Sequence, residues 1–100
     1  MELIALLWAL AEVLAIIFVF LLTFADLLGW FETNDSLIYE DAENIAFTLQ
    51  EKLSTGKYET VQGIFNKREK NIVRGRKVRS DKVDEKIAAK HVREELVVYE

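Results

Sequence analysis

The sequence predicts a membrane protein with one transmembrane helix followed by a small α+β domain. Three observations support this fold class: a nearly uninterrupted apolar segment fills residues 3–31, all 13 Lys and Arg residues lie after residue 51, and short helical and β-rich patterns follow residue 37. We therefore expect a transmembrane helix over residues 1–31, a linker over 32–36 and a compact extramembrane domain over 37–100.

The apolar segment has the length that a membrane crossing needs. A bilayer core of about 30 Å requires about 20 helical residues. Trp8 and Trp30 are separated by 22 positions, or about 33 Å of helix, so both rings would lie at membrane interfaces. A cleaved signal peptide is disfavoured because the start has no basic residues and the apolar run is too long. A hairpin-like or interfacial helix and a buried helix of an oligomer are the alternatives.

One side of the expected helix carries small or polar residues, and the opposite side carries Leu, Ile and Phe. Small side chains let helices approach closely, and acidic groups inside a bilayer usually face protein or water. We therefore expect a seam that docks on partner helices, with Glu12 meeting a basic or backbone donor. The alternative is a lone anchor whose Glu12 is protonated or reaches the interface. The seam consists of Ala5, Ala9, Glu12, Val19, Thr23 and Asp26.

The positions of the basic residues suggest a topology. We expect an integral, single-pass membrane protein whose C-terminal domain lies on the cytoplasmic side, because every Lys and Arg follows the helix. None of them lies within about 20 residues of a helix end, which is the range in which charge controls topology.

The segment after the linker predicts the order α-β-β-α-β with a small, antiparallel-type sheet. Apolar residues recur at intervals of three and four over residues 37–54, which predicts an amphipathic helix that ends near Gly56. Two β-rich runs at 57–66 and 71–79, joined by a polar turn, predict a hairpin. Ser80 or Asp81 is expected to cap a second helix that reaches Val92, and residues 95–100 are expected to form a strand.

The turn and second strand of this hairpin are strongly basic. Four interpretations are open: a solvated sheet face, docking on an acidic partner, attraction to anionic lipid, and nucleic-acid binding. Nucleic acid is disfavoured because Phe65 is the sole nearby aromatic residue and the charge excess is modest. The basic surface comprises Lys67, Arg68, Lys70, Arg74, Arg76, Lys77 and Arg79.

The sequence lacks the usual catalytic and metal-binding patterns. It has no cysteine, which excludes thiolate chemistry, disulfides and the usual zinc sites, and His91 is its only histidine. Acidic residues near 40–43 and 81–85 lie at expected helix starts, where the helix dipole accounts for them. We therefore expect no enzymatic activity, no cofactor and a packing role for His91.

Together these expectations favour an accessory, structural subunit of a larger membrane-protein complex. Its helix would dock through the seam, and its small domain would cap or brace the complex. Other membrane-protein subunits and the lipid bilayer are thus the expected partners. The alternative is a membrane-tethered binding module whose basic hairpin contacts anionic lipid or nucleic acid. A third hypothesis is self-association through the same seam.

Overall fold

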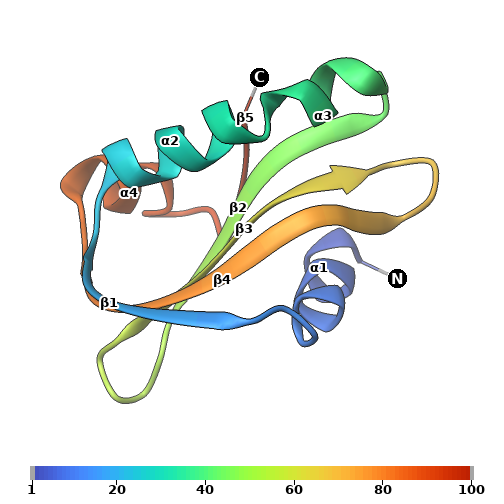
Figure 1. Cartoon of the computed structure of the whole chain (residues 1–100). Helices are drawn as coiled ribbons and strands as arrows, with labels where there is room; N and C mark the ends of the chain where they lie inside the picture. Colours follow the sequence, from blue (N-terminus) through green and yellow to red (C-terminus); the bar gives the residue numbers. More distant parts are fainter. Residues whose placement is uncertain (1, 100) are drawn as a thin grey trace.

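The computed structural model describes residues 2–99, which form a five-stranded mixed sheet with helices on both faces (Figure 1). The strand order across the sheet is β1-β4-β3-β2-β5. β1 runs parallel to β4, and the other neighbouring strands are antiparallel. The elements along the chain are α1 (Leu3–Ala11), β1 (Ile16–Leu22), α2 (Phe24–Thr33), α3 (Asp35–Glu40), β2 (Asn44–Lys52), β3 (Tyr58–Asn66), β4 (Asn71–Val83), α4 (Glu85–Lys90) and β5 (Leu96–Tyr99).

The predicted transmembrane helix is wrong. The apolar segment forms a nine-residue helix, a seven-residue strand and most of a ten-residue helix instead. Among residues 2–99, none of the helices combines the length and the apolar character that a bilayer crossing needs. The expected membrane fold class and the expected single-pass location, with its cytoplasmic C-terminal side, are corrected on this ground: the chain is an α+β fold on a mixed sheet.

Local signals divide the apolar segment into these three elements. α1 ends at Ala11, with Glu12 as its C-cap. Thr23 caps α2, because its hydroxyl accepts a hydrogen bond from the backbone N–H of Asp26 at 3.1 Å. Such a cap satisfies an N–H group that has no partner within the helix. Between these points, the β-branched and aromatic residues of β1 suit a pleated strand.

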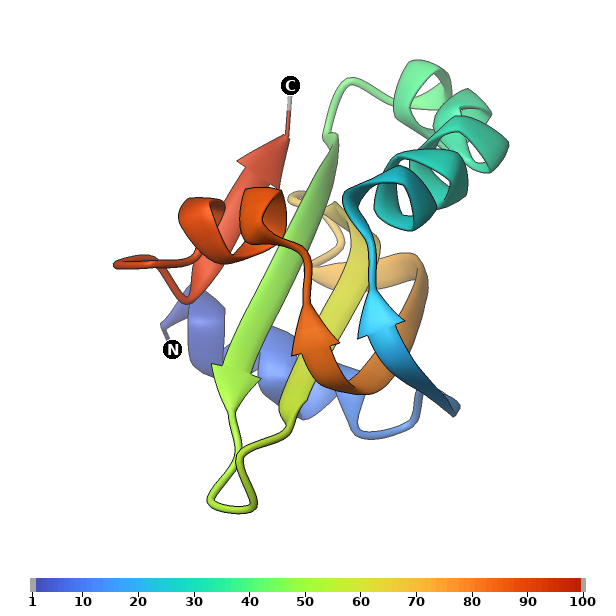
Figure 2. The ribbon, with the colours of Figure 1, turned by 90° about the vertical axis from the view of Figure 1, so that its left-hand side faces the viewer.

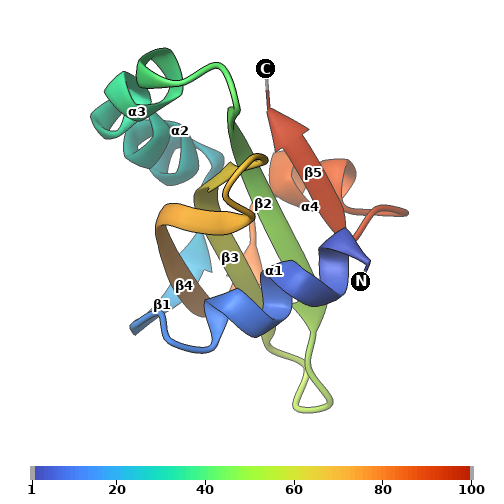
Figure 3. The ribbon, with the colours of Figure 1, turned by 90° about the vertical axis from the view of Figure 1, so that its right-hand side faces the viewer.

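One face of the sheet is covered by α1 (Figure 3). Gly63 of β3 leaves room for the Phe47 ring, since a Cβ there would lie 3.0 Å from that ring and 3.0 Å from the carbonyl oxygen of Arg74. The core on this face joins α1 to the central strands β2 and β3. Its buried members are Leu7, Ala11, Phe47, Leu49, Val61 and Phe65.

The opposite face is covered by α2 and α4, as Figure 2 shows with α1 behind the sheet. α4 begins after Asp84, whose carboxylate accepts a hydrogen bond from the backbone N–H of Lys86 at 3.0 Å. This second core connects the end of β1 to both helices through β4. Its buried members are Leu22, Leu27, Val78 and Ile87.

The predicted hairpin is present, but its second strand is longer than expected. β3 and β4 pair from Tyr58–Ser80 to Asn66–Asn71, with a register shift after Ile64 that marks a β-bulge. β4 continues to Val83 because it also pairs with β1. Ser80 and Asp81 therefore lie within a strand, and the expected helix caps at these positions are wrong.

The predicted helix over residues 37–54 is also wrong. Only Asp35–Glu40 is helical there, and Asn44–Lys52 forms β2 between β3 and β5. Both faces of β2 are covered, so Phe47 and Leu49 are buried on one face and Ala46 and Thr48 on the other. A strand buried on both faces shows no alternation of polar and apolar residues. Its apolar positions then matched a helical spacing by coincidence.

Candidate functional site

β1 is an edge strand whose side chains are largely exposed. Its sequence, IIFVFLL, contains no charged residue, and within residues 2–99 no strand pairs with the side that faces away from β4. Figure 2 shows β1, in blue, along the right-hand edge of the sheet. Phe18 is 69% exposed and Phe20 is 66% exposed. Natural edge strands are usually protected by charge, proline or a covering element, so this edge is the leading candidate for a binding surface.

Basic side chains of β4 flank the two exposed rings. The guanidinium carbon of Arg79 lies 5.8 Å from the centroid of the Phe18 ring, and Lys82 Nζ lies 5.8 Å from that of Phe20. These are favourable cation–π distances. Arg79 also pairs with Glu59 at 2.6 Å. The edge therefore has an apolar outer strand with positive charge on the strand behind it.

A partly buried row of hydrogen-bonded side chains lies on the face covered by α2 and α4. Thr48 Oγ1 is 2.8 Å from His91 Nε2 and 2.8 Å from the hydroxyl oxygen of Tyr99. His91 Nδ1 is 2.9 Å from the carbonyl oxygen of Glu94, which can only accept. Nδ1 therefore carries the proton in neutral His91, Nε2 accepts from Thr48, and Tyr99 donates to Thr48. Each side chain has its partner.

Thr48 and His91 are residue types that can serve as a nucleophile and a base, but the geometry of this hydrogen-bonded group suits packing. Thr48 is completely buried, and the His91 ring is oriented by a backbone carbonyl rather than by a carboxylate. Burial lowers the pKa of His91 and raises the pKa of Tyr99, so both groups are neutral near pH 7. The contacts tie β2 and β5 to the end of α4.

Arg76 connects α2 to the sheet. Its Nε donates to Gln62 Oε1 at 2.8 Å, and one of its terminal nitrogens pairs with Asp26 at 2.9 Å. Gln62 is fully buried, and its Nε2 donates to the carbonyl oxygen of Leu27 at 2.7 Å. Both ends of this buried amide are thus satisfied, which a buried polar group requires.

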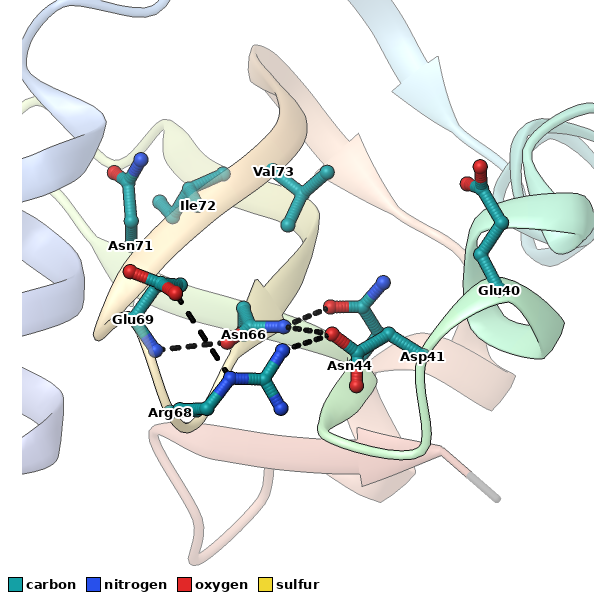
Figure 4. Close-up of a pocket in the computed structure, with 9 residues that line it drawn as sticks. All are labelled: Glu40, Asp41, Asn44, Asn66, Arg68, Glu69, Asn71, Ile72 and Val73. Carbon is teal, nitrogen blue, oxygen red and sulfur yellow. Dashed lines mark hydrogen bonds and ion pairs between the residues drawn. The ribbon is translucent and has the colours of Figure 1, made fainter.

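A polar hollow of about 550 Å³ lies beside the β3–β4 turn (Figure 4). The Asn66 side-chain amide donates to Asn44 at 2.7 Å and to Asp41 at 3.1 Å, while Arg68 reaches the same Asp41 carboxylate. Hydrogen bonds lower the pKa of Asp41: the largest effect comes from the backbone N–H of Glu43, and the next from the side chain of Arg68. These groups satisfy one another, which is the pattern of a structural cluster that fixes a turn.

The structure does not gather the predicted seam on one surface. Its members are Ala5 and Ala9 on the exposed side of α1, Glu12 after α1, Val19 in β1, Thr23 before α2 and Asp26 within α2. Val19 packs against the second core, and Asp26 pairs with Arg76. Docking of these residues on a partner helix stays a prediction without a continuous surface to support it.

The predicted basic surface is divided between the turn and the two faces of the sheet. Lys67 and Arg68 pair with Glu43 and Asp41 at the turn. Lys70 also lies in the turn. On the α2 side, Arg74 contacts Asn34 and Arg76 contacts Asp26. Lys77 and Arg79 lie further along β4. Binding of an anionic partner stays a prediction, but most of these cations already have acceptors.

The comparisons with known proteins are negative. No protein-family model, curated protein or solved structure matches this chain.

Sequence reasoning missed the β1 edge, although two local signals pointed to it. Thr23 precedes Asp26 by three positions, which is the spacing of a helix start. The IIFVFLL run is rich in β-branched and aromatic residues and shorter than a typical helix. Together they favour a strand that ends before a new helix.

Proposed function

We propose that the chain is a non-enzymatic assembly module that binds an extended protein strand along the outer edge of β1. The observation that carries this proposal is the uncharged, seven-residue edge strand with its exposed Phe18 and Phe20. An edge strand offers backbone N–H and C=O groups to a further strand. An added strand satisfies these groups, and its side chains lie next to those of β1 on both faces.

The surface favours an apolar occupant. Seven residues of strand span about 23 Å. Phe18 and Phe20 are exposed on one face of β1, and Ile17 and Leu21 are each 45% exposed on the other, so the added strand must be apolar on both faces. A basic strand is disfavoured because Arg79 and Lys82 lie on the neighbouring strand.

This proposal keeps the docking role that we expected for an accessory subunit, but a strand edge replaces the membrane helix. Recruitment of anionic lipid or nucleic acid by the basic hairpin has less support. Arg68, Arg76 and Arg79 each form an ion pair within the chain, and binding an external anion would compete with these pairs.

The test uses a synthetic peptide that carries the β1 sequence between terminal glutamates. The control is the same peptide with N-methylated central amides, which cannot form the ladder of backbone hydrogen bonds. We expect the first peptide to slow hydrogen exchange at β1 amides of the full chain, and the methylated peptide to leave it unchanged. Strand addition is contradicted if both peptides slow the exchange of β1 amides equally, or if neither peptide slows it.

A pair of lysine substitutions locates the binding surface. Phe18→Lys places a charge on the edge beside Arg79, and we expect roughly three- to tenfold weaker peptide binding. Tyr39→Lys changes a residue that is 84% exposed on α3 and should leave the affinity unchanged. Calorimetric titration measures both affinities, and circular dichroism checks that both variants fold.

A further inference from the structure

The β1 sequence is nearly the same when read in either direction. IIFVFLL has Val19 at its centre, Phe18 and Phe20 on either side, and Ile or Leu at the outer positions. Two copies of such a strand match residue by residue when they run antiparallel. Binding of an unrelated strand does not require a symmetric sequence. The symmetry of β1 therefore bears on which strand pairs with it.

We infer that the strand that pairs with β1 is β1 of a second copy of this chain, antiparallel about a two-fold axis through Val19. This inference rests on the proposed function and names its partner. In this register Phe18 lies opposite Phe20 of the second copy, and Ile17 lies opposite Leu21. The backbone groups of both edges are satisfied at the same time.

The dimer gathers the exposed aromatic rings. Phe18 and Phe20 lie two positions apart in the strand and therefore share a face, so four rings meet on one side of the joined sheets. Their exposed fractions of 69% and 66% correspond to roughly 500 Å² of aromatic surface in a dimer. Aromatic cross-strand pairs are among the favourable pairs in antiparallel sheets.

The charges next to β1 tolerate this arrangement. The strand itself carries none. Arg79 and Lys82 belong to β4, and the two β4 strands of the dimer would be three strand spacings apart, or about 14 Å. This separation exceeds the screening length of about 8 Å at physiological salt, and Arg79 is already paired with Glu59. Repulsion across the axis is therefore weak.

The other end of the sheet is a poorer partner for β1. β5 has four residues, and Tyr99 within it is held by Thr48. Pairing of β1 with β5 of another copy would be head-to-tail and would leave an edge open at each end, so it would continue into a filament. Pairing of β1 with β1 uses the same surface twice and closes at two copies.

The expected dimer is weak and depends on concentration. Each copy contributes one seven-residue strand, so we expect a small interface compared with the roughly 1,200–2,000 Å² that specific interfaces bury in total. We therefore expect sedimentation equilibrium of the full chain to show a monomer–dimer equilibrium in the micromolar range. Phe18→Lys should shift it toward the monomer, while Tyr39→Lys should not.

Cysteine crosslinking tests the register. The chain has no cysteine, so Val19→Cys introduces a single thiol on the proposed axis, where the two Cβ atoms would be about 5 Å apart, close to disulfide range. Ile17→Cys places its two thiols about 14 Å apart, which is beyond that range. An equimolar mixture of Ile17→Cys and Leu21→Cys should crosslink, since these positions face each other.

The outcomes separate this inference from the proposed function. Efficient crosslinking of Val19→Cys and of the mixed pair, with at least about tenfold less for Ile17→Cys alone, supports the two-fold register. Peptide binding by a chain that stays monomeric overturns the inference and leaves the proposed function standing. A dimer that Phe18→Lys does not weaken uses another surface and also overturns it. A monomer that binds no peptide overturns both.

Discussion

His91 is half-buried at the C-terminal end of α4. Its ring closes a hydrogen-bonded chain from Tyr99 through Thr48 to the carbonyl oxygen of Glu94. The chain requires the neutral ring, because protonated Nε2 could no longer accept from Thr48. Burial acts in the same direction and lowers the pKa of His91.

This environment makes stability depend on pH. Because the folded pKa of His91 is below its unfolded value of about 6.5, the unfolded chain binds the proton more readily. We expect the free energy of unfolding to be at its full value above about pH 6.5 and to fall as the pH drops below it. Asp41 and Asp84 have lowered pKa values, so they act in the same sense only at lower pH, and the raised pKa of Glu51 acts in the opposite sense.

Urea unfolding at about pH 7, 6 and 5 measures this slope. His91→Gln should cost about 1 kcal/mol at neutral pH and remove most of the slope. Val92→Gln, at the adjacent exposed position, should keep it. A slope that is the same in both variants would assign the pH dependence to other groups.

At the scale of elements, α1 has one buried side and one exposed side, although apolar residues lie on both sides. Leu7 is 1% exposed and packs against the sheet, whereas Leu3 on the same helix is 39% exposed. The two leucines are chemically identical, so the tertiary contacts alone distinguish them.

Leu7→Ala and Leu3→Ala form a matched pair. We expect Leu7→Ala to lower the free energy of unfolding by about 2–5 kcal/mol, because it removes buried methyl groups and leaves a cavity. Leu3→Ala should cost about 0.5 kcal/mol. Denaturant unfolding of the two variants measures the difference. Equal losses would contradict the packing of α1 on the sheet.

At the scale of the whole molecule, two cores share one sheet. Ile72 of β4 packs on the α1 side, and Val78 of the same strand belongs to the core under α2 and α4. If β4 detached from one core, it would also leave the other core and expose that core to water. The two faces should therefore unfold in one cooperative transition.

The two tryptophans report on opposite faces of the sheet. Trp8 packs against the α1 core, and Trp30 lies in α2 with its ring 6.0 Å from the Arg76 guanidinium carbon. We expect Trp30→Phe and Trp8→Phe, followed by fluorescence during urea unfolding, to retain a single transition that coincides with the one seen by far-UV circular dichroism. Transitions that differ between the fluorescence and circular dichroism of one variant would show that the faces unfold separately.

Strong local signals were interpreted correctly where one structure alone could satisfy them. The polar turn between two β-rich runs gave the β3–β4 hairpin, and the ELVVYE run contains β5. Gly56 was expected to end a helix; it lies instead in the turn between β2 and β3 with φ of +90°, a conformation that other residues rarely adopt. The β2 segment was misread because both of its faces are buried, so its pattern carried no period of two.

By itself, the sequence determined which residues must leave water and where the chain must turn. Only the tertiary structure decided what covers those residues. A run that is apolar on every side fits a bilayer, a buried helix or a strand equally well, because the local pattern does not identify the surface that removes it from water. For residues 16–22 the deciding element is β4, which lies far along the chain: pairing with it turns an expected membrane helix into an edge strand whose side chains stay largely exposed.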